Sequence, residues 1–230
     1  MTDTPPENEN KTVSPLTEVE RRILGVLMEK ARTTPDAYPL SLNGLVTGCN
    51  QKSNRAPLMS LSSDEVEDVL SSLRERGIVA EVHGGGRVAK YRHYGYDHLG
   101  VKGAEAGVMA ELMLRGEQTL GDLRSRASRF EPIADQNTLK SILASLEEKD
   151  LVLFLTPEGR GQMVTHNLYD PGELAAIREQ VAAGHVTPAR SSTSSSRANN
   201  EELEALKQSV STLQSQVEQL VERVTRLESQ

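Results

Sequence analysis

The segment Cys49–Ser60, with the sequence CNQKSNRAPLMS, concentrates side chains that could bind nucleic acid. Amide and guanidinium groups can form paired hydrogen bonds with base edges, whereas Lys and Ser suit phosphate oxygens. The candidate DNA-binding residues in this loop are Asn50, Gln51, Lys52, Ser53, Asn54 and Arg55. An alternative is that Asn and Ser only satisfy backbone groups in an ordered turn.

Further cations lie in a predicted β-hairpin that follows this loop. Ile78–Val82 and Val88–Arg92 have the character of two strands, and the glycine-rich segment His83–Arg87 joins them. This hairpin adds Arg87, Lys90 and Arg92 to the candidates, and an equivalent hairpin later in the chain adds Arg160. Arg124, Arg126 and Arg129 are grouped on or just after another short helix.

Catalytic and metal-binding patterns are weak by comparison. Gly84–Gly86 lacks the spacing and the following helix of a phosphate-binding P-loop, which favours a hairpin turn. The histidines form no metal-binding helical pair, and Cys49 has no catalytic partner in the sequence, so it is interpreted as a small, partly buried apolar residue. The expectation is a protein that is not an enzyme and holds no metal or cofactor.

Composition limits how these residues are used. The chain has 230 residues, a net charge of -7, 37% hydrophobic residues and no Trp, which favours two small cores over one large core. A negative net charge means that any DNA contact must be local. With one Cys, no apolar run of about 18 residues and no signal-peptide pattern at its start, the chain is expected to be cytoplasmic, without membrane contact.

The elements that position the candidates follow one order. A capping box at Thr17 and Glu20 opens a helix that is expected over Leu16–Arg32, and Tyr38–Leu40 is expected to be extended. A short helix around Leu42–Val46 precedes the loop, and a second capping box, at Ser62 and Glu65, opens a helix that ends at Gly77. Helix, strand, helix, helix and hairpin is the order of a winged-helix domain.

The same order recurs further along the chain. The apolar residues Val108, Met109, Leu112 and Met113 repeat Ile23, Leu24, Leu27 and Met28 at an offset of 85 residues. The later elements repeat at an offset of 73: Gly86-Arg87 falls on Gly159-Arg160, His93 on His166, and Tyr96-Asp97 on Tyr169-Asp170. An internal duplication explains these matches.

The predicted fold is therefore mainly α with small β-hairpins, an α+β class with two tandem winged-helix domains and a C-terminal coiled coil. The expected boundaries are a disordered start at 1–15, domain one at 16–98, domain two with a closing helix at 99–183, a Ser-rich flexible linker at 184–200 and a coiled coil at 201–230.

The coiled coil is predicted from apolar residues spaced alternately by three and four. Most a positions are Val and the d positions are Leu, a combination that favours a parallel dimer. The residues that would form this contact with a second copy are Leu203, Leu206, Val210, Leu213, Val217, Leu220, Val224 and Leu227. The alternative is a single amphipathic helix that packs back on the body.

The stretches LTEVERRILGVLMEK and YPLSLNGLVTGCNQKSNRAP resemble the YceH family of bacterial proteins, and LMLRGEQTLGDLRSRASRF is similar to that family's second domain. The resemblance spans Leu16–Asp170. It implies a tandem winged-helix fold and brings no activity with it.

Two functions follow from these observations. The first is a dimeric DNA-binding or transcription-regulating protein that contacts DNA through local basic elements. The second is a protein-interaction adaptor without DNA contact, comparable to the chromosome-segregation protein ScpB. The adaptor is favoured by the acidic start of the first domain's third helix, which carries Asp64, Glu65, Glu67 and Asp68 and would repel phosphates.

Overall fold

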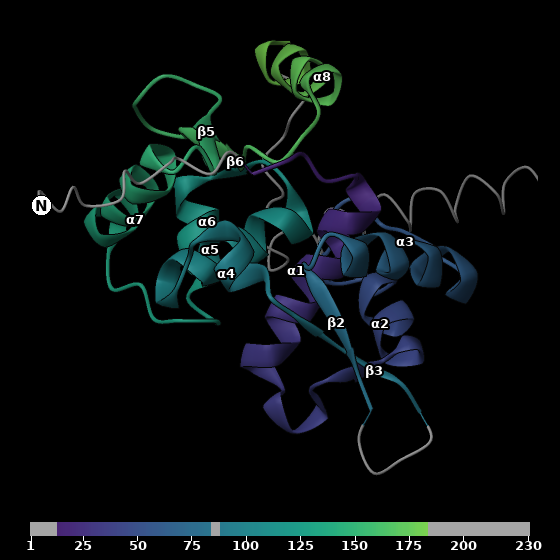
Figure 1. Ribbon diagram of the computed structural model, residues 1–230. Helices are drawn as coiled ribbons and strands as arrows, with labels where there is room; N and C mark the ends of the chain where they lie inside the picture. Colours follow the sequence, from purple (N-terminus) through teal and green to yellow (C-terminus); the bar gives the residue numbers. More distant parts are fainter. Residues whose placement is uncertain (1–12, 84–87, 184–230) are drawn as a thin grey trace, which may run out of the picture. The chain divides into compact units, whose positions relative to one another are not determined.

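A computed structural model describes residues 13–83 and 88–183 of the chain. This part contains small antiparallel sheets among helices, and the same element order occurs twice (Figure 1). The first repeat consists of α1 (Glu18–Thr33), the 3-10 turn η1 (Pro35–Ala37), β1 (Leu40–Ser41), α2 (Leu42–Cys49), α3 (Ser63–Glu75), β2 (Val79–Val82), β3 (Lys90–His93) and α4 (Gly95–Leu99). The second consists of α5 (Gly103–Arg115), β4 (Gln118–Thr119), α6 (Leu120–Ala127), α7 (Gln136–Glu148), β5 (Val152–Phe154), β6 (Met163–His166) and α8 (Pro171–Ala182).

Both predicted capping boxes are confirmed. The Thr17 hydroxyl accepts a hydrogen bond from the Glu20 backbone N–H at 3.3 Å, and the Glu20 carboxylate accepts one from the Thr17 N–H at 2.8 Å. Ser62 and Glu65 repeat both bonds at the start of α3. Because each box satisfies backbone donors that a helix start leaves free, it fixes where α1 and α3 begin.

The duplication extends to strand register and local hydrogen bonds. The sheets have the equivalent orders β1-β3-β2 and β4-β6-β5, and the pairing of Val79 with His93 recurs as Val152 with His166, 73 residues later. In each repeat the buried histidine accepts a hydrogen bond at Nδ1 from the backbone N–H two residues on, at 3.1 Å from Gly95 and 3.2 Å from Leu168. Burial lowers the pKa of His93 to about 4 and that of His166 well below its ordinary value, so both rings act as neutral structural acceptors near neutral pH.

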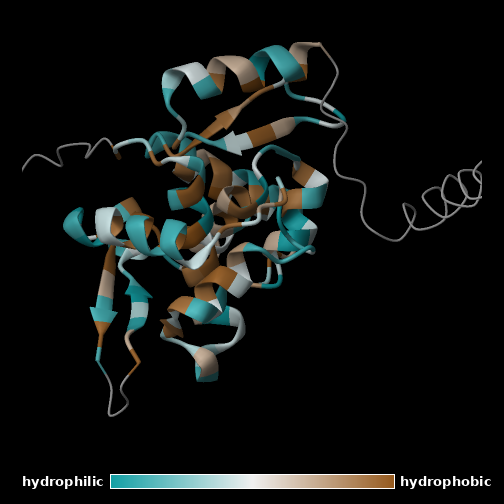
Figure 2. Ribbon diagram, turned by 90° about the vertical axis from the view of Figure 1, so that its right-hand side faces the viewer, coloured by the Kyte–Doolittle hydropathy of each residue, from teal (hydrophilic) through white to brown (hydrophobic). Residues whose placement is uncertain are grey.

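The core lies between the repeats, where α1 packs against α5. Gly25 makes this approach possible, because a Cβ at that position would meet Leu114 Cγ at 3.0 Å. Every residue of α5 from Ala106 to Leu114 is buried, which is typical of a central helix covered on all sides. Apolar residues accordingly gather at the centre in Figure 2, where both repeats contribute to one cluster.

Some elements differ from the sequence prediction. The strand expected at Tyr38–Leu40 lies at Leu40–Ser41, and η1, β4 and α4 were not predicted. The predicted disordered start lies largely, and the linker and coiled coil lie entirely, outside the described residues. No helix within residues 13–83 and 88–183 is long and apolar enough to cross a membrane.

Helix packing around Gly48 gives a test of this core. A Cβ at Gly48 would lie 2.7 Å from Val26 Cγ1, a stiff β-branched side chain on buried α1. We predict that Gly48→Ala lowers the free energy of unfolding by ~1–3 kcal/mol through overpacking, although Ala is the better helix former by about 1 kcal/mol. Urea denaturation measures the change.

Gly121→Ala is the matched control, because nothing lies within 4 Å of the added methyl group on α6. That variant should keep or slightly raise the stability of the protein. If both variants were equally stable, the close contact between α1 and α2 would be wrong.

Candidate nucleic-acid interface

Several polar side chains of the loop that follows α2 form hydrogen bonds with other parts of the protein. Asn50 pairs with the backbone of Leu61: its amide donates to the carbonyl and its oxygen accepts from the N–H, both at 2.8 Å. Gln51 accepts a hydrogen bond from Arg55 at 2.7 Å, and Asn54, at a positive φ of 59°, accepts one from Arg115 at 2.5 Å. Of the six candidates in this loop, only Lys52 and Ser53 are exposed without a hydrogen bond or ion pair to other described residues.

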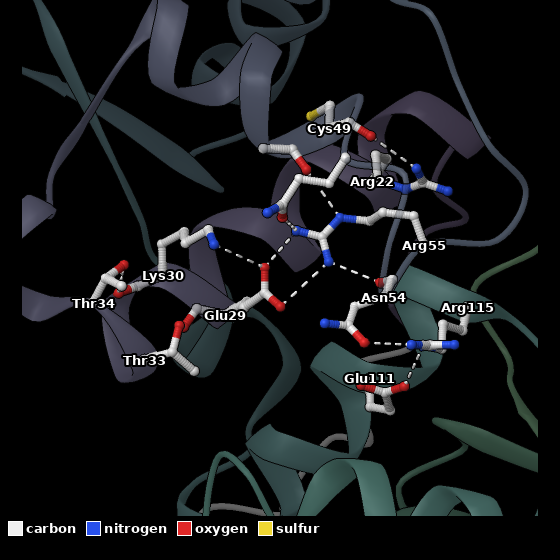
Figure 3. Close-up of polar contacts among 12 residues, drawn as sticks. Arg22, Glu29, Lys30, Thr33, Thr34, Cys49, Asn54, Arg55, Glu111 and Arg115 are labelled. Atoms are coloured by element: carbon white, nitrogen blue, oxygen red, sulfur yellow. Dashed lines mark hydrogen bonds and ion pairs between the residues drawn. The ribbon is translucent and has the colours of Figure 1, made fainter. Parts of the chain in front are cut away.

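Arg55 differs most from its predicted role. Its side chain lies inside the protein and forms an ion pair with Glu29 of α1, with an Nη2–Oε2 distance of 2.5 Å (Figure 3). Its Nε donates to the Gly48 carbonyl at 2.9 Å, and its Nη1 donates to the Asn54 carbonyl at 2.8 Å. The guanidinium of Arg55 makes five hydrogen bonds inside the protein, which leaves no N–H group for a phosphate, so we do not include Arg55 in the candidate interface.

The ion pair between Arg55 and Glu29 continues into the second repeat. Arg129, which follows α6, lies 2.9 Å from Glu29 Oε1 and also 2.9 Å from Glu111 Oε2 on α5. Arg115 Nε lies 3.0 Å from Glu111 Oε1, but the two atoms are not aligned as a hydrogen bond. Glu29, Arg55, Glu111, Arg115 and Arg129 thus form one group of charges, which we call the interface cluster, between the two repeats.

The two carboxylates of the interface cluster have opposite pKa shifts. Burial raises the pKa of Glu29, but the hydrogen bond and charge of Arg55, together with the charge of Arg129, outweigh burial and leave that pKa below 4.5. Burial dominates at Glu111, which is fully enclosed, and raises its pKa despite Arg129 and Arg115. Glu29 is therefore the carboxylate whose ionised form the cluster stabilises.

The candidates on the hairpins do not share one surface. Lys90 and Arg92 are exposed on β3, where the Arg92 guanidinium lies 5.1 Å from the Tyr94 ring centroid. Arg160 belongs to the loop between β5 and β6. That hairpin lies at the opposite end of the described unit from the hairpin of β2 and β3 (Figures 1 and 2). Arg87 lies outside the described residues.

The helices that follow the two loops, α3 and α7, present different chemistry. On α3, the exposed residues of the first two turns include the carboxylates Asp64, Glu65, Glu67 and Asp68. On α7, the exposed residues over the same stretch include Gln136, Asn137, Thr138 and Lys140. An approaching phosphate would be repelled more strongly by the four carboxylates of α3 than at the start of α7, where the exposed N-cap Asp135 carries one carboxylate.

A groove of about 620 Å³ brings the start of α7 together with the second hairpin loop and the start of α6. Its lining includes Gln136, Asn137 and Lys140 from α7 and Arg160 from the hairpin loop. Lys140 forms an ion pair with exposed Glu158 at 2.6 Å. The sequence interpretation named Arg160 alone of this set. The 73-residue offset could have identified Gln136, Asn137 and Lys140, because it aligns α7 with α3, the third helix of the first repeat.

The interface cluster gives a prediction with a defined pH dependence. Glu29→Gln should lower the free energy of unfolding by about 3–5 kcal/mol near pH 7, because Arg55 and Arg129 lose their buried counter-charge. The pKa of Glu29 is lowered in the folded protein, so its contribution is complete above about pH 4.5 and is lost as the pH falls through the folded value. Urea denaturation should therefore show wild type and variant converging below that pH.

Glu148→Gln, on the exposed end of α7, is the control and should change stability by no more than about 0.5 kcal/mol. A loss for Glu29→Gln as small as that of the control, or a gap that does not narrow in acid, would contradict the role given to the interface cluster.

Comparison with known proteins places the chain in a family. The model of the family described as "Protein of unknown function, DUF480" matches residues 16–162. A UPF0502 protein of Rhodopirellula baltica is 48% identical over 202 residues, which cover 85% of each chain. A UPF0502 protein of Geobacter sulfurreducens is 40% identical over 86% of this chain and 90% of its own, and one of Shewanella halifaxensis is 37% identical over 92% and 98%.

These matches confirm the predicted membership in a bacterial family without an assigned activity, whereas the name YceH stays a prediction. They extend over both repeats, so the loop, the interface cluster and the whole lining of the groove lie within the segment matched by the family model. The chain belongs to the DUF480 family, whose curated bacterial relatives are named UPF0502 proteins.

Proposed function

We propose that each repeat is a winged-helix domain and that the second repeat binds duplex DNA, with α7 as the recognition helix and the loop between β5 and β6 as the wing. The observation that carries this proposal is the groove at the start of α7, where Gln136, Asn137, Lys140 and Arg160 converge. In a winged helix, the third helix enters the major groove and its N-terminal residues contact base edges.

The side chains of this groove suit the two kinds of contact that DNA requires. Asn137 and Gln136 carry amides, which pair with the adenine edge, while Lys140 and Arg160 suit phosphates or guanine. Gly121, Gly159 and Gly161 line the same groove and carry no side chain that would keep a DNA backbone away. Lys140 would exchange its exposed Glu158 partner for a phosphate, at little cost because surface ion pairs contribute about 0–1 kcal/mol.

Local binding of this kind agrees with the net charge of -7. The four exposed carboxylates at the start of α3 would keep the first repeat's third helix away from DNA. The same carboxylates favour a second candidate function, an adaptor that presents α3 to a basic protein surface and makes no contact with DNA.

The proposal includes pairing of two copies through the heptad residues between Leu203 and Leu227. A parallel dimer would offer two copies of α7 to two half-sites, as paired winged-helix and helix-turn-helix proteins do. Sedimentation of the full chain should give the mass of two copies; a monomer at micromolar concentration would remove the dimer from the proposal.

Salt-dependent titration of a short mixed-sequence duplex tests DNA binding. We predict that Lys140→Ala and Arg160→Ala each weaken binding about fivefold and reduce the slope of log affinity against log salt by about 1, because each removes a phosphate contact. Asn137→Ala should leave this slope unchanged, since an amide releases no counterion.

Lys52→Ala is the matched control, because it removes one exposed Lys from the first repeat. It should bind DNA as the wild type does. If Lys52→Ala weakened binding while Lys140→Ala did not, the contact would lie on the first repeat. An absence of binding at low salt would reject DNA binding and leave the adaptor.

A further inference from the structure

Arg22 of α1 is a buried cation without a carboxylate partner among the described residues. It is 1% exposed, and its hydrogen bonds go to two backbone carbonyls, Cys49 O at 3.0 Å and Pro57 O at 2.6 Å. Its Nε has no hydrogen-bond acceptor within residues 13–83 and 88–183. Because an isolated buried charge is costly, this position favours an anion that is not part of the described chain.

Arg22 lines a pocket of about 520 Å³, a volume in the usual range for small-molecule sites. The pocket lies where the first repeat, the end of α5 and α8 meet. Its apolar lining comes from Pro57 and Met59 of the first repeat, Met113 of α5, and Ala176 and Ile177 of α8. The pocket therefore combines the buried guanidinium of Arg22 with a partly apolar lining.

The other charges that line the pocket are compensated or exposed. Arg21 forms an ion pair with Glu173 of α8, and Arg115 forms one with Glu111. Glu18 is exposed, and Glu117, which also lines the pocket, is only partly buried, so solvent screens both. Burial and the charge of Arg55 lower the pKa of Arg22, and the charge of Glu18, which acts in the opposite direction, does not offset them.

We propose that this pocket binds a small organic anion, with its carboxylate or phosphate group at Arg22 and a short apolar chain along Met59, Met113 and Ile177. Two of the five N–H groups of the guanidinium bind carbonyls, which leaves donors for such a group. This site is separate from the groove at α7, since the two linings have no residue in common.

The bound anion would also hold α8. No residue of α8 is fully buried, and Glu173 joins the helix to α1 through an ion pair with Arg21, which lies 4.5 Å from the Tyr169 ring centroid. A ligand between α1 and α8 adds apolar contacts to Ala176 and Ile177, so backbone amides of α8 should exchange more slowly with solvent when it is bound.

The test is an NMR titration of the full chain with hexanoate and with hexyl phosphate, in the absence of DNA. We expect saturable shifts at α8 and around Arg22 with at least one of the two, and the stronger binder identifies the head group. Hexanol, which has the same apolar chain and no charge, should bind at least about tenfold more weakly, a difference equivalent to ~1.4 kcal/mol for one charge-assisted contact.

Variants separate a specific site from general attraction to a surface. Arg22→Met should abolish saturable binding, and Ile177→Glu, at a half-buried position on α8, should weaken binding at least about tenfold by placing a carboxylate in the pocket. Ala175→Glu introduces the same charge at an exposed position of α8 outside the lining and should bind as the wild type does.

Equal binding by Ile177→Glu and Ala175→Glu would overturn the proposal, even if Arg22→Met failed to fold. Failure of both anions to saturate would also overturn it. Neither result would affect the DNA-binding proposal, because the titration contains no DNA and the variants leave α7 unchanged.

Discussion

The carboxylate of Glu29 is the point on which much of the described structure depends. It accepts contacts from Arg55, which belongs to the loop after α2, and from Arg129, which belongs to the second repeat. One buried charge on α1 thus fixes both a polar loop and the neighbouring repeat. A buried ion pair adds little net stability compared with apolar packing, but removing one partner is costly, so such a group specifies one arrangement of the elements it joins.

The contacts that hold the two repeats together are buried, so the exposed surfaces of the repeats can differ without disturbing those contacts. Strand register, sheet order and the buried histidine are the same in both repeats, which shows how closely the internal framework is shared. The helices α3 and α7 occupy equivalent places yet carry carboxylates in one case and amides with Lys140 in the other. This difference between the two surfaces agrees with the proposal that the second repeat binds DNA. The first repeat would then support the second or bind a different partner.

Much of the framework could be predicted from local pattern. The capping boxes at Thr17 and Ser62 and the apolar spacing of the helices are properties of short segments, and the structure has them where they were expected. The 73-residue offset is found by comparing such segments along the chain. The role of Arg55 could not be predicted, because its partner Glu29 lies 26 residues away on a helix that has the amphipathic pattern of a surface element. Glu29 is buried where α1 meets the loop after α2 and the second repeat, and such contacts between distant segments have no local signal. The elements β1 and β4 have two residues each and exist through pairing with β3 and β6, which is also a distant contact.

Hydrogen exchange on the full chain, with and without a DNA duplex, tests most directly the proposal that the second repeat binds DNA and the first does not. The account predicts slower exchange at the start of α7 and in the loop between β5 and β6 when DNA is present, and unchanged exchange at the start of α3. Protection at α3 instead, with α7 unaffected, would contradict it.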